Sequence, residues 1–453
     1  MPSTAPSDAT TADQGPLTRS QRLDRLPFSR AHGKLLAGSG VGWALDAMDV
    51  GLISFVMTAL AKEWGLGQGQ LSLIGSIGFV GMAIGASLGG LLADKFGRRH
   101  IFALTLLVYG LATGASALVG SVAALIALRF LVGLGLGAEL PVASTLVSEF
   151  APRAIRGRVV VALEAFWALG WIMAALLGYL LIPNVDNGWR WALAVGLVPT
   201  LYAAVVRFGL LESVRFLESK DRDAEAEAAV QVFERSAGVE PPPPSDTRVV
   251  DQSEEHDEGP TSIWSRELRG RTVGLWIVWF MINFSYYGAF IWMPTLLFKA
   301  GHTMVQSFQY TLIITLAQLP GYAVAAWLIE AWGRRPTLAT FLAGSAVGAV
   351  LFGMADSPTM IILTGCVLSF FNLGAWGALY AIGPELYPTT VRGAGTGAAA
   401  GFGRIASILA PLSVPILLGW GGRPLTFAVF GAAFVIAAAA CFALPERRNR
   451  ALD

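Results

Sequence analysis

The sequence predicts an all-α membrane protein with twelve transmembrane helices in two pseudo-symmetric six-helix bundles. Three observations support this fold class. Hydrophobic residues make up 54% of the 453 residues and charged residues only 14%, whereas an ordinary globular domain carries about 25% charged residues. Apolar runs of membrane-spanning length recur along the chain, and two polar motifs recur at one fixed offset.

The apolar runs are each long enough to cross a hydrocarbon core of about 30 Å, which takes roughly 20 helical residues. In chain order they cover residues 35–60, 70–93, 101–119, 122–150, 159–182, 189–211, 272–298, 307–331, 337–355, 358–386, 396–419 and 425–444. An even number of spans places both termini on the same side of the membrane.

The basic residues indicate which side that is. Of the 32 Lys and Arg, 26 lie on the side predicted to be cytoplasmic and four on the other, which fits the positive-inside rule. Residues 1–34 lack the apolar core of a secretory signal. We therefore expect a cytoplasmic N-terminal extension (1–34), a cytoplasmic tail (445–453) and a multi-pass membrane protein. Abundant Ala, Gly and Arg suggest a bacterial source, so the expected location is a bacterial inner membrane.

Residues 212–271 are the one long break between apolar runs, and they separate the two predicted bundles, 35–211 and 272–444. The break holds a charged stretch, four consecutive prolines at 241–244 and an acidic run from Asp251 to Glu258. This composition is typical of a linker that is partly helical and partly disordered.

Composition also excludes several classes of function. A net charge of +1 offers nucleic acid no strongly basic surface. Two cysteines in apolar runs and four scattered histidines provide no metal-ligand cluster, and no nucleophile and base pair is visible in the spans. We expect no enzyme activity, no cofactor and no metal; the expected partners are a small-molecule substrate, protons and lipid, with a monomeric chain.

Two motifs repeat 236 residues apart. The stretch from Gly90 to Arg99 contains an acid, a glycine and two arginines, and the stretch from Ala326 to Arg335 has the same pattern. The segment from Glu149 to Gly157 is likewise repeated from Glu385 to Gly393. A shared offset indicates internal duplication.

These motif residues have two open interpretations. Ion pairs between neighbouring helices would form a cytoplasmic gate, or the arginines simply fix orientation. The positions with an expected gate role are Gly90, Asp94, Gly97, Arg98, Arg99, Glu149, Arg156, Glu330, Arg334, Arg335, Glu385 and Arg392.

The repeated motifs resemble those of the major facilitator superfamily over nearly the whole chain. Residues 42–51, 137–149, 285–288, 315–322 and 369–377 are similar to the bacterial nicotinate transporter branch, which is close to aromatic-acid:proton symporters. The resemblance implies the major facilitator fold and proton-coupled uptake of a small aromatic monocarboxylate, nicotinate first, by alternating access. The N-terminal extension and the Pro-rich linker depart from the branch.

Acidic residues within spans are candidates for proton coupling, because each costs roughly 2.5–3.5 kcal/mol at mid-bilayer unless it faces protein or water. Asp46 and Asp49 are three residues apart and share one helix face, so they are not expected both to be ionised. Glu139 lies beside the helix-disturbing Pro141, and Glu164 lies in the fifth span. Hydrogen bonding between helices by protonated acids is the alternative role.

Arg404 lies about eight residues into the eleventh span and needs an anion, either Glu164 or a substrate carboxylate. Arg129 is expected to be structural, paired with an acid of the first span. Aromatic and amide side chains near the membrane centre would surround a flat ring. The predicted substrate-binding residues are Arg404, Trp167, Trp171, Asn283, Tyr286, Tyr287, Gln318, Asn372, Trp376 and Tyr380.

Other functions remain open at this point. A symporter for benzoate-like acids fits the same residues, and a sugar porter fits the general motifs, although sugar sites rarely need a buried arginine. A non-transporting receptor is disfavoured by the intact, duplicated motifs.

Overall fold

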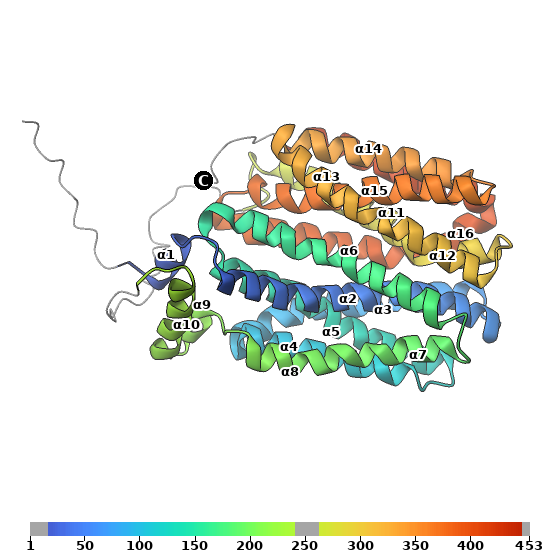
Figure 1. Cartoon of the computed structure of the whole chain (residues 1–453). Helices are drawn as coiled ribbons and strands as arrows, with labels where there is room; N and C mark the ends of the chain where they lie inside the picture. Colours follow the sequence, from blue (N-terminus) through green and yellow to red (C-terminus); the bar gives the residue numbers. More distant parts are fainter. Residues whose placement is uncertain (1–16, 241–261, 446–453) are drawn as a thin grey trace, which may run out of the picture.

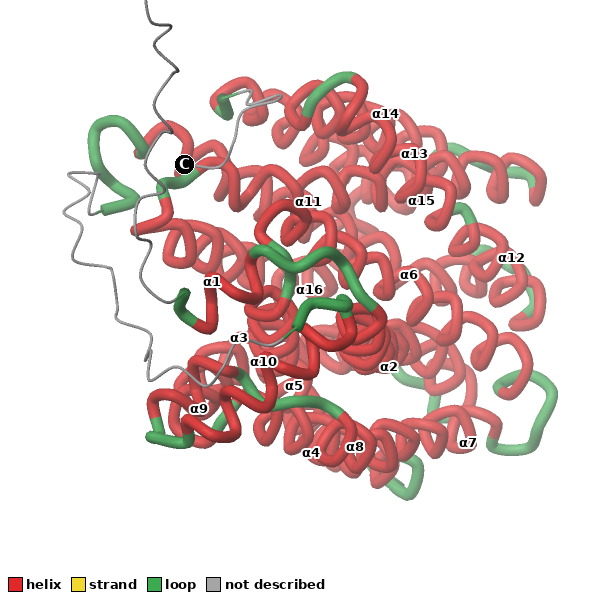
Figure 2. Tube along the Cα trace, turned by 60° about the vertical axis from the view of Figure 1, so that its left-hand side comes forward, coloured by secondary structure: helices red, strands yellow, loops and turns green. Residues whose placement is uncertain are grey.

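The computed structural model describes residues 17–240 and 262–445, apart from some side chains within these ranges. All regular structure in this part of the chain is helical, as Figure 2 shows. The N-terminal half contains α2 (Arg30–Glu63), α3 (Gln68–Phe96), α4 (Arg98–Ser116), α5 (Val122–Phe150), α6 (Arg156–Leu181), α7 (Gly188–Ala194) and α8 (Val198–Gly209). The C-terminal half contains α11 (Arg269–Lys299), α12 (Met304–Leu316), α13 (Gln318–Ala331), α14 (Arg334–Gly353), α15 (Pro358–Ile382) and α16 (Thr389–Ala440).

The helices account for twelve crossings. Ten helical stretches of the described chain are long and apolar enough to cross a membrane. The 19-residue α4 adds one crossing. The 52-residue α16 adds another, because Gly421 and Gly422 leave the helical conformation and divide it into two. The predicted fold class is therefore confirmed.

Two spans are divided in ways that the apolar pattern does not reveal. The sixth consists of α7 and α8, joined by a short 3-10 turn just before Pro199. The eighth consists of α12 and α13, which meet at Ala317, three residues before Pro320. Proline lacks a backbone donor and is tolerated in the first turn of a helix, so each proline favours a new start.

The two halves pack in the same way. In the N-terminal half α2 packs on α6, α3 on α5 and α4 on α8; in the C-terminal half α11 packs on α16, α13 on α15 and α14 on α16. Figure 1 shows these two groups of long helices side by side. The halves meet through α2 with α11, α6 with α12, and α3 with α16.

Glycines let α3 and α5 approach closely. A Cβ added at Gly133 would lie 2.0 Å from the carbonyl oxygen of Gly78, and one at Gly137 would lie 2.0 Å from that of Met82. Small residues at such contacts are the usual basis of helix packing in lipid, where no hydrophobic force drives helices together.

Three short helices gather at one end of the bundles (Figure 1): α1 (Arg19–Asp24), α9 (Val214–Ser219) and α10 (Asp223–Ser236). The predicted linker is thus helical in its first part; the proline run and the acidic run lie outside the described residues. The first membrane helix begins at Arg30 rather than near residue 35. The proposed domain boundaries remain a prediction.

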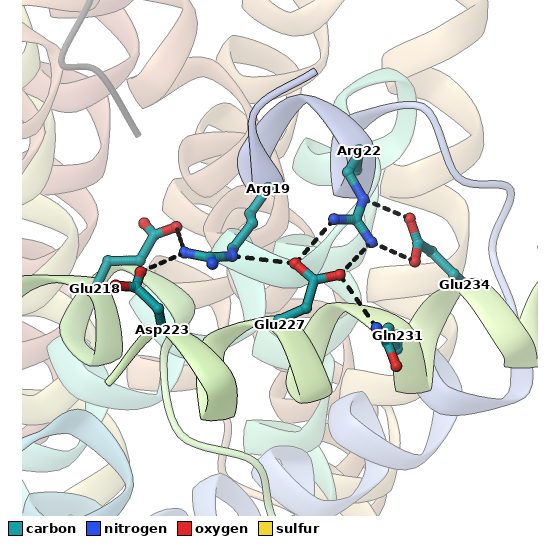
Figure 3. Close-up of polar contacts among 7 residues, drawn as sticks. All are labelled: Arg19, Arg22, Glu218, Asp223, Glu227, Gln231 and Glu234. Atoms are coloured by element: carbon teal, nitrogen blue, oxygen red, sulfur yellow. Dashed lines mark hydrogen bonds and ion pairs between the residues drawn. The ribbon is translucent and has the colours of Figure 1, made fainter. Parts of the chain in front are cut away.

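Two arginines of α1 join it to the other two short helices (Figure 3). Arg19 contacts Glu218, Asp223 and Glu227 at 2.8–3.2 Å. Arg22 donates to Glu227 at 2.8 Å and to Glu234 at 2.7 Å. Arg22 and Glu234 are almost fully buried. We call this set of six residues the α1 network.

Candidate functional site

A cavity lies between the two halves. About 360 Å³ between its walls is not filled by atoms, a figure that includes space open to solvent. The centre of a water molecule can occupy about 20 Å³ of it, so the walls lie close together in this conformation. Its walls come from both halves: Trp43, Glu164, Trp167, Trp279, Asn283, Tyr286, Tyr287, Tyr322, Trp376, Tyr380 and Arg404. We call it the central cavity.

The cavity walls are mainly aromatic rings in mutual contact. The ring centres of Trp43 and Trp167 are 4.9 Å apart, and those of Tyr286 and Trp376 are 5.9 Å apart. The Trp167 indole donates to the Tyr286 hydroxyl at 3.2 Å across the boundary between the halves. Trp376 and Tyr380 are stacked, with 28° between their planes. Such faces fit a flat aromatic ligand.

Arg404 is the one cation among the described residues that line the cavity. It lies near the Tyr287 hydroxyl and within electrostatic range of Glu164, yet no carboxylate of the described residues comes within 4.0 Å of its guanidinium. Of the two anions predicted for it, Glu164 is therefore not a direct ion-pair partner. The guanidinium remains available to a ligand carboxylate, which it can hold with two parallel hydrogen bonds.

Seven of the ten predicted substrate residues line the cavity, and so does Glu164. Asn283 is among them, but its amide already donates to Trp279 O at 2.7 Å and accepts from Ser407 at 2.9 Å. Sequence reasoning missed Trp43, Trp279 and Tyr322 as wall residues. Tyr322 follows Gln318 by four residues, so the helical repeat was a signal that pointed to it.

Trp171, Gln318 and Asn372 do not line the cavity in this conformation, so their contact with substrate stays a prediction. Each lies one helical turn from a wall residue: Trp171 follows Trp167 by four, whereas Gln318 and Asn372 precede Tyr322 and Trp376 by four. All three are fully buried. The sequence indicated the correct helix faces but not how far along them the cavity extends.

The two aspartates of α2 have different partners. Asp49 accepts from Arg129 at 2.9 Å and from the Thr113 hydroxyl at 2.6 Å, all within the bundle interior. The predicted pairing of Arg129 with an acid of the first span is thus present in the structure. Asp49 is a hydrogen-bonded counter-ion.

Asp46 lies instead beside Glu139 of α5 and Tyr109 of α4. Both carboxyl groups are buried, with at most 1% of their surface exposed. Although the three groups are adjacent, none of their side-chain oxygens makes a hydrogen bond of ordinary geometry to a described residue. Two unpaired buried carboxyls in contact are not both ionised without large cost. The sequence placed Asp46 next to Asp49 and missed this partnership between helices.

The gate residues of the N-terminal half form a connected set near the short helices. Arg98 and Glu149 form an ion pair at 2.6 Å, with Asp94 3.7 Å from Arg98. Glu149 also accepts from Ser213. The Arg99 backbone N–H donates to Glu212 at 3.0 Å, and Arg156 pairs with Asp24 beside α1.

Gly97, which links α3 to α4, has a φ of +97° that other residues rarely adopt. Gly333 occupies the matching position in the C-terminal half with a φ of +104°. Arg334 and Arg335 begin α14 there, and Arg335 donates to Leu444 O at 3.2 Å. The positions Gly90, Glu330, Glu385 and Arg392 lie outside the described side chains.

The two halves touch at the end opposite the short helices. Thr58 and Thr295 hydroxyls are 2.9 Å apart, and the Phe55 and Phe308 rings are 5.1 Å apart. By contrast, the contacts described for Asp94, Arg98, Arg99, Glu149 and Arg156 stay within the N-terminal half and its short helices. These pairs do not bridge the halves in this conformation.

Comparison with known proteins agrees with this architecture. Residues 42–453 match the model of a family described as "Sugar (and other) transporter". The chain belongs to this transporter family. Because the match begins at Gly42, Arg19 and Arg22 of the α1 network lie outside it.

Several relatives within the transporter family are similar over most of their length. The niacin transporter NiaP of Acinetobacter baylyi is 49% identical, covering 87% of this chain and 89% of its own. The putative niacin/nicotinamide transporter NiaP of Bacillus subtilis is 45% identical, covering 92% and 96%. The synaptic vesicle 2-related protein of Xenopus laevis is 30% identical, covering 95% and 81%.

Solved structures share the fold at low identity. The partially occluded inward-open xylose transporter XylE from E. coli superposes with a TM-score of 0.75 at 18% identity, covering 94% of this chain and 100% of that one. XylE is described as a major facilitator superfamily proton:xylose symporter. The chain thus has the major facilitator fold, and it is a multi-pass membrane transporter rather than an enzyme.

Proposed function

We propose that this transporter takes up nicotinate, a small aromatic monocarboxylate, together with protons, by alternating access. The names of the two bacterial relatives at 49% and 45% identity support nicotinate. The proton:xylose symporter of the same fold supports proton coupling. A bacterial inner membrane, cytoplasmic termini and a monomeric chain belong to this proposal.

The observation that carries the proposal is Arg404 in the aromatic central cavity without an ion-pair partner among the described residues. A guanidinium in such a place recognises a planar carboxylate, and the surrounding rings provide faces for an aromatic ring. The ligand that satisfies both is a flat acid, whereas a sugar would leave the charge unmatched.

Protons are assigned to Asp46, Glu139 and Glu164. Asp46 and Glu139 are buried neighbours whose oxygens have no hydrogen-bond partner among the described residues, and neither lines the central cavity. A proton bound there changes the charge of the N-terminal half without contacting the substrate. Glu164 lies in the cavity wall, where its charge acts on Arg404. We assign Asp49 a supporting role as counter-ion of Arg129. The gate residues would stabilise one conformation through the contacts described above.

Binding to the purified protein, measured by calorimetry, tests the substrate assignment. We expect nicotinate to bind, benzoate to bind more weakly, and xylose not to bind. Nicotinamide is the informative competitor, because it has the same ring without the charge; we expect weak binding. Stronger binding of nicotinamide than of nicotinate would contradict the role of Arg404. Preferential binding of benzoate would favour the alternative, a symporter for benzoate-like acids.

A further inference from the structure

A group of buried polar side chains lies next to the central cavity and has no role in the contacts described so far. Gln318 of α13, Ser369 and Asn372 of α15, and Trp171 of α6 are each 0% exposed. Both polar atoms of Gln318, both of Asn372, the Ser369 hydroxyl and the Trp171 N–H have no hydrogen-bond partner among the described residues. Buried polar groups are nearly always paired, so a set of unpaired ones requires a ligand or water.

The helix register brings these side chains to one level. A Cβ at Gly321 would meet Phe370 O at 2.2 Å, and Cys366 contacts Ile313 O at 3.8 Å. The span made of α12, which contains Ile313, and α13, which contains Gly321, therefore runs parallel to α15, and Gln318 lies level with the turn from Ser369 to Asn372.

This level is one turn beyond the cavity, away from α1. The start of α6 is near α1, since Arg156 pairs with Asp24, so the step from Trp167 to Trp171 leads away from that end. The end of α15 is near the start of α11, since Arg271 donates to Leu386 O at 3.3 Å. Asn372 precedes the wall residue Trp376 by four residues, and Gln318 precedes Tyr322 by four. Both therefore also lie on the side of the cavity away from α1.

The Tyr286 ring connects the two levels. Its centre is 5.9 Å from that of Trp376 in the cavity wall and 5.8 Å from that of Trp171. Arg404, beside Tyr287, lies at the level of the cavity wall. One helical turn, ~5.4 Å along the helix axes, thus separates the level of the guanidinium from that of the unpaired amides.

We propose that Gln318 and Asn372 form a subsite that recognises the hydrogen-bond acceptor of the substrate ring, the pyridine nitrogen of nicotinate. This inference rests on the proposed function. A carboxylate held by Arg404 and a ring clamped by aromatic faces point the far side of the ring toward the amides. An amide N–H donates to the ring nitrogen, whereas benzoate offers only a C–H there. The subsite therefore selects nicotinate over benzoate.

The test compares nicotinate and benzoate binding for wild type, Gln318→Met and Asn372→Leu, measured calorimetrically on the full-length protein. Each variant keeps side-chain bulk but removes the amide. We expect nicotinate affinity to fall roughly three- to tenfold, the usual effect of one neutral hydrogen bond. Benzoate affinity should stay the same or rise. Gln309→Met, an exposed site on α12, is the matched control and should change neither.

Equal losses for both acids, or an unchanged ratio, would overturn the subsite and leave these amides with water alone. The melting temperature of the variants provides a second test, of whether the amides have partners within the protein. An unpaired buried amide replaced by an apolar group of similar shape is neutral or stabilising, so a clear fall in melting temperature would show that the amides already have protein partners. If wild type binds neither acid, the proposed function fails and the subsite fails with it.

Discussion

At the scale of single residues, substitutions of Arg404 distinguish recognition of the ligand's charge from recognition of its ring. Replacing it with alanine removes the anion's partner, and replacing it with lysine keeps the charge but loses the planar fork. A charge-assisted contact contributes about 1.5–3 kcal/mol, so Arg404→Ala should weaken nicotinate roughly ten- to hundredfold. Nicotinamide binding should hardly change. Trp376→Ala, the control for stacking, should weaken both ligands.

Two aspartates three residues apart should behave in opposite ways. Asp49→Asn leaves the buried Arg129 without its counter-ion, and breaking a buried pair costs on the order of 3–5 kcal/mol. Its melting temperature should therefore fall clearly. Asp46→Asn breaks no described hydrogen bond and should leave stability nearly unchanged.

Asp46→Asn and Glu139→Gln should instead abolish proton-driven accumulation, because an amide carries no proton. Substrate exchange without a gradient should survive in part. Wild-type accumulation by both variants would exclude this couple as a proton site, and Glu164 would then be the remaining candidate.

Much of the candidate site was predictable from residue type, since charged and amide groups inside apolar runs must face protein or cavity. Arg404, Glu164 and the aromatic cluster of α11 were found this way. The couple of Asp46 with Glu139 was not, because the two are 93 residues apart and only helix packing brings them together. The wall residues Trp43 and Trp279 were missed because an aromatic side chain in a membrane span usually faces lipid or packs in the protein core.

At the scale of elements, the contact between α3 and α5 depends on glycine. Gly133→Ala would place its methyl group against the Gly78 carbonyl, so the helices must separate, which typically costs 1–3 kcal/mol. We expect a lower melting temperature and loss of transport. Gly401→Ala on α16 is the control, because a Cβ there meets nothing within 4 Å. Equal stability of the two variants would show that close packing of α3 on α5 is dispensable.

The α1 network should hold α10 in place. Arg22→Ala leaves Glu227 and Glu234 without their main partner, so backbone hydrogen exchange in 214–236 should speed up. Arg222→Ala, which removes an exposed pair with Glu225, is the control and should change exchange little. Unchanged protection in Arg22→Ala would show that apolar packing alone anchors α10.

The same network predicts a pH dependence. Burial favours a higher pKa for Glu227, but hydrogen bonds from Arg22 and Arg19 outweigh it and lower that pKa below its ordinary 4.5. A lowered pKa means that this carboxylate stabilises the folded state fully above pH 4.5 and loses that effect as pH falls through the lower value. The contribution of Glu227 to the protection of α10 should therefore be constant between pH 5 and 8, about the range where proton coupling is measured, so the difference in protection between wild type and Glu227→Gln should not change over this range. A fall in that difference within the range would contradict this assignment.

At the scale of the whole molecule, the spans were predictable because lipid requires about 20 apolar residues for each crossing. The internal repeat was predictable because two motifs share one offset. In the structure, corresponding helices of the two halves pack in the same pairs. The divided sixth and eighth spans and the α1 network were not predictable, since they depend on local proline geometry and on pairs more than 190 residues apart.

In transport by alternating access, the contacts between the two halves decide which side of the central cavity is closed. The halves touch near Thr58 and Thr295, whereas the described gate pairs at the other end do not cross between them. The central cavity is therefore covered on the side opposite α1. Proton binding at Asp46 and Glu139, inside the N-terminal half, would change the balance between this conformation and its counterpart.

The central claim is that proton flow drives nicotinate through this cavity, and uptake into proteoliposomes tests it most directly. With an inward proton gradient, wild type should accumulate labelled nicotinate above the external concentration, and an ionophore that collapses the gradient should reduce uptake to equilibration. Arg404→Ala should show little uptake at the same substrate concentration. Accumulation by wild type that is indifferent to the proton gradient, or full accumulation by Arg404→Ala, would contradict the account.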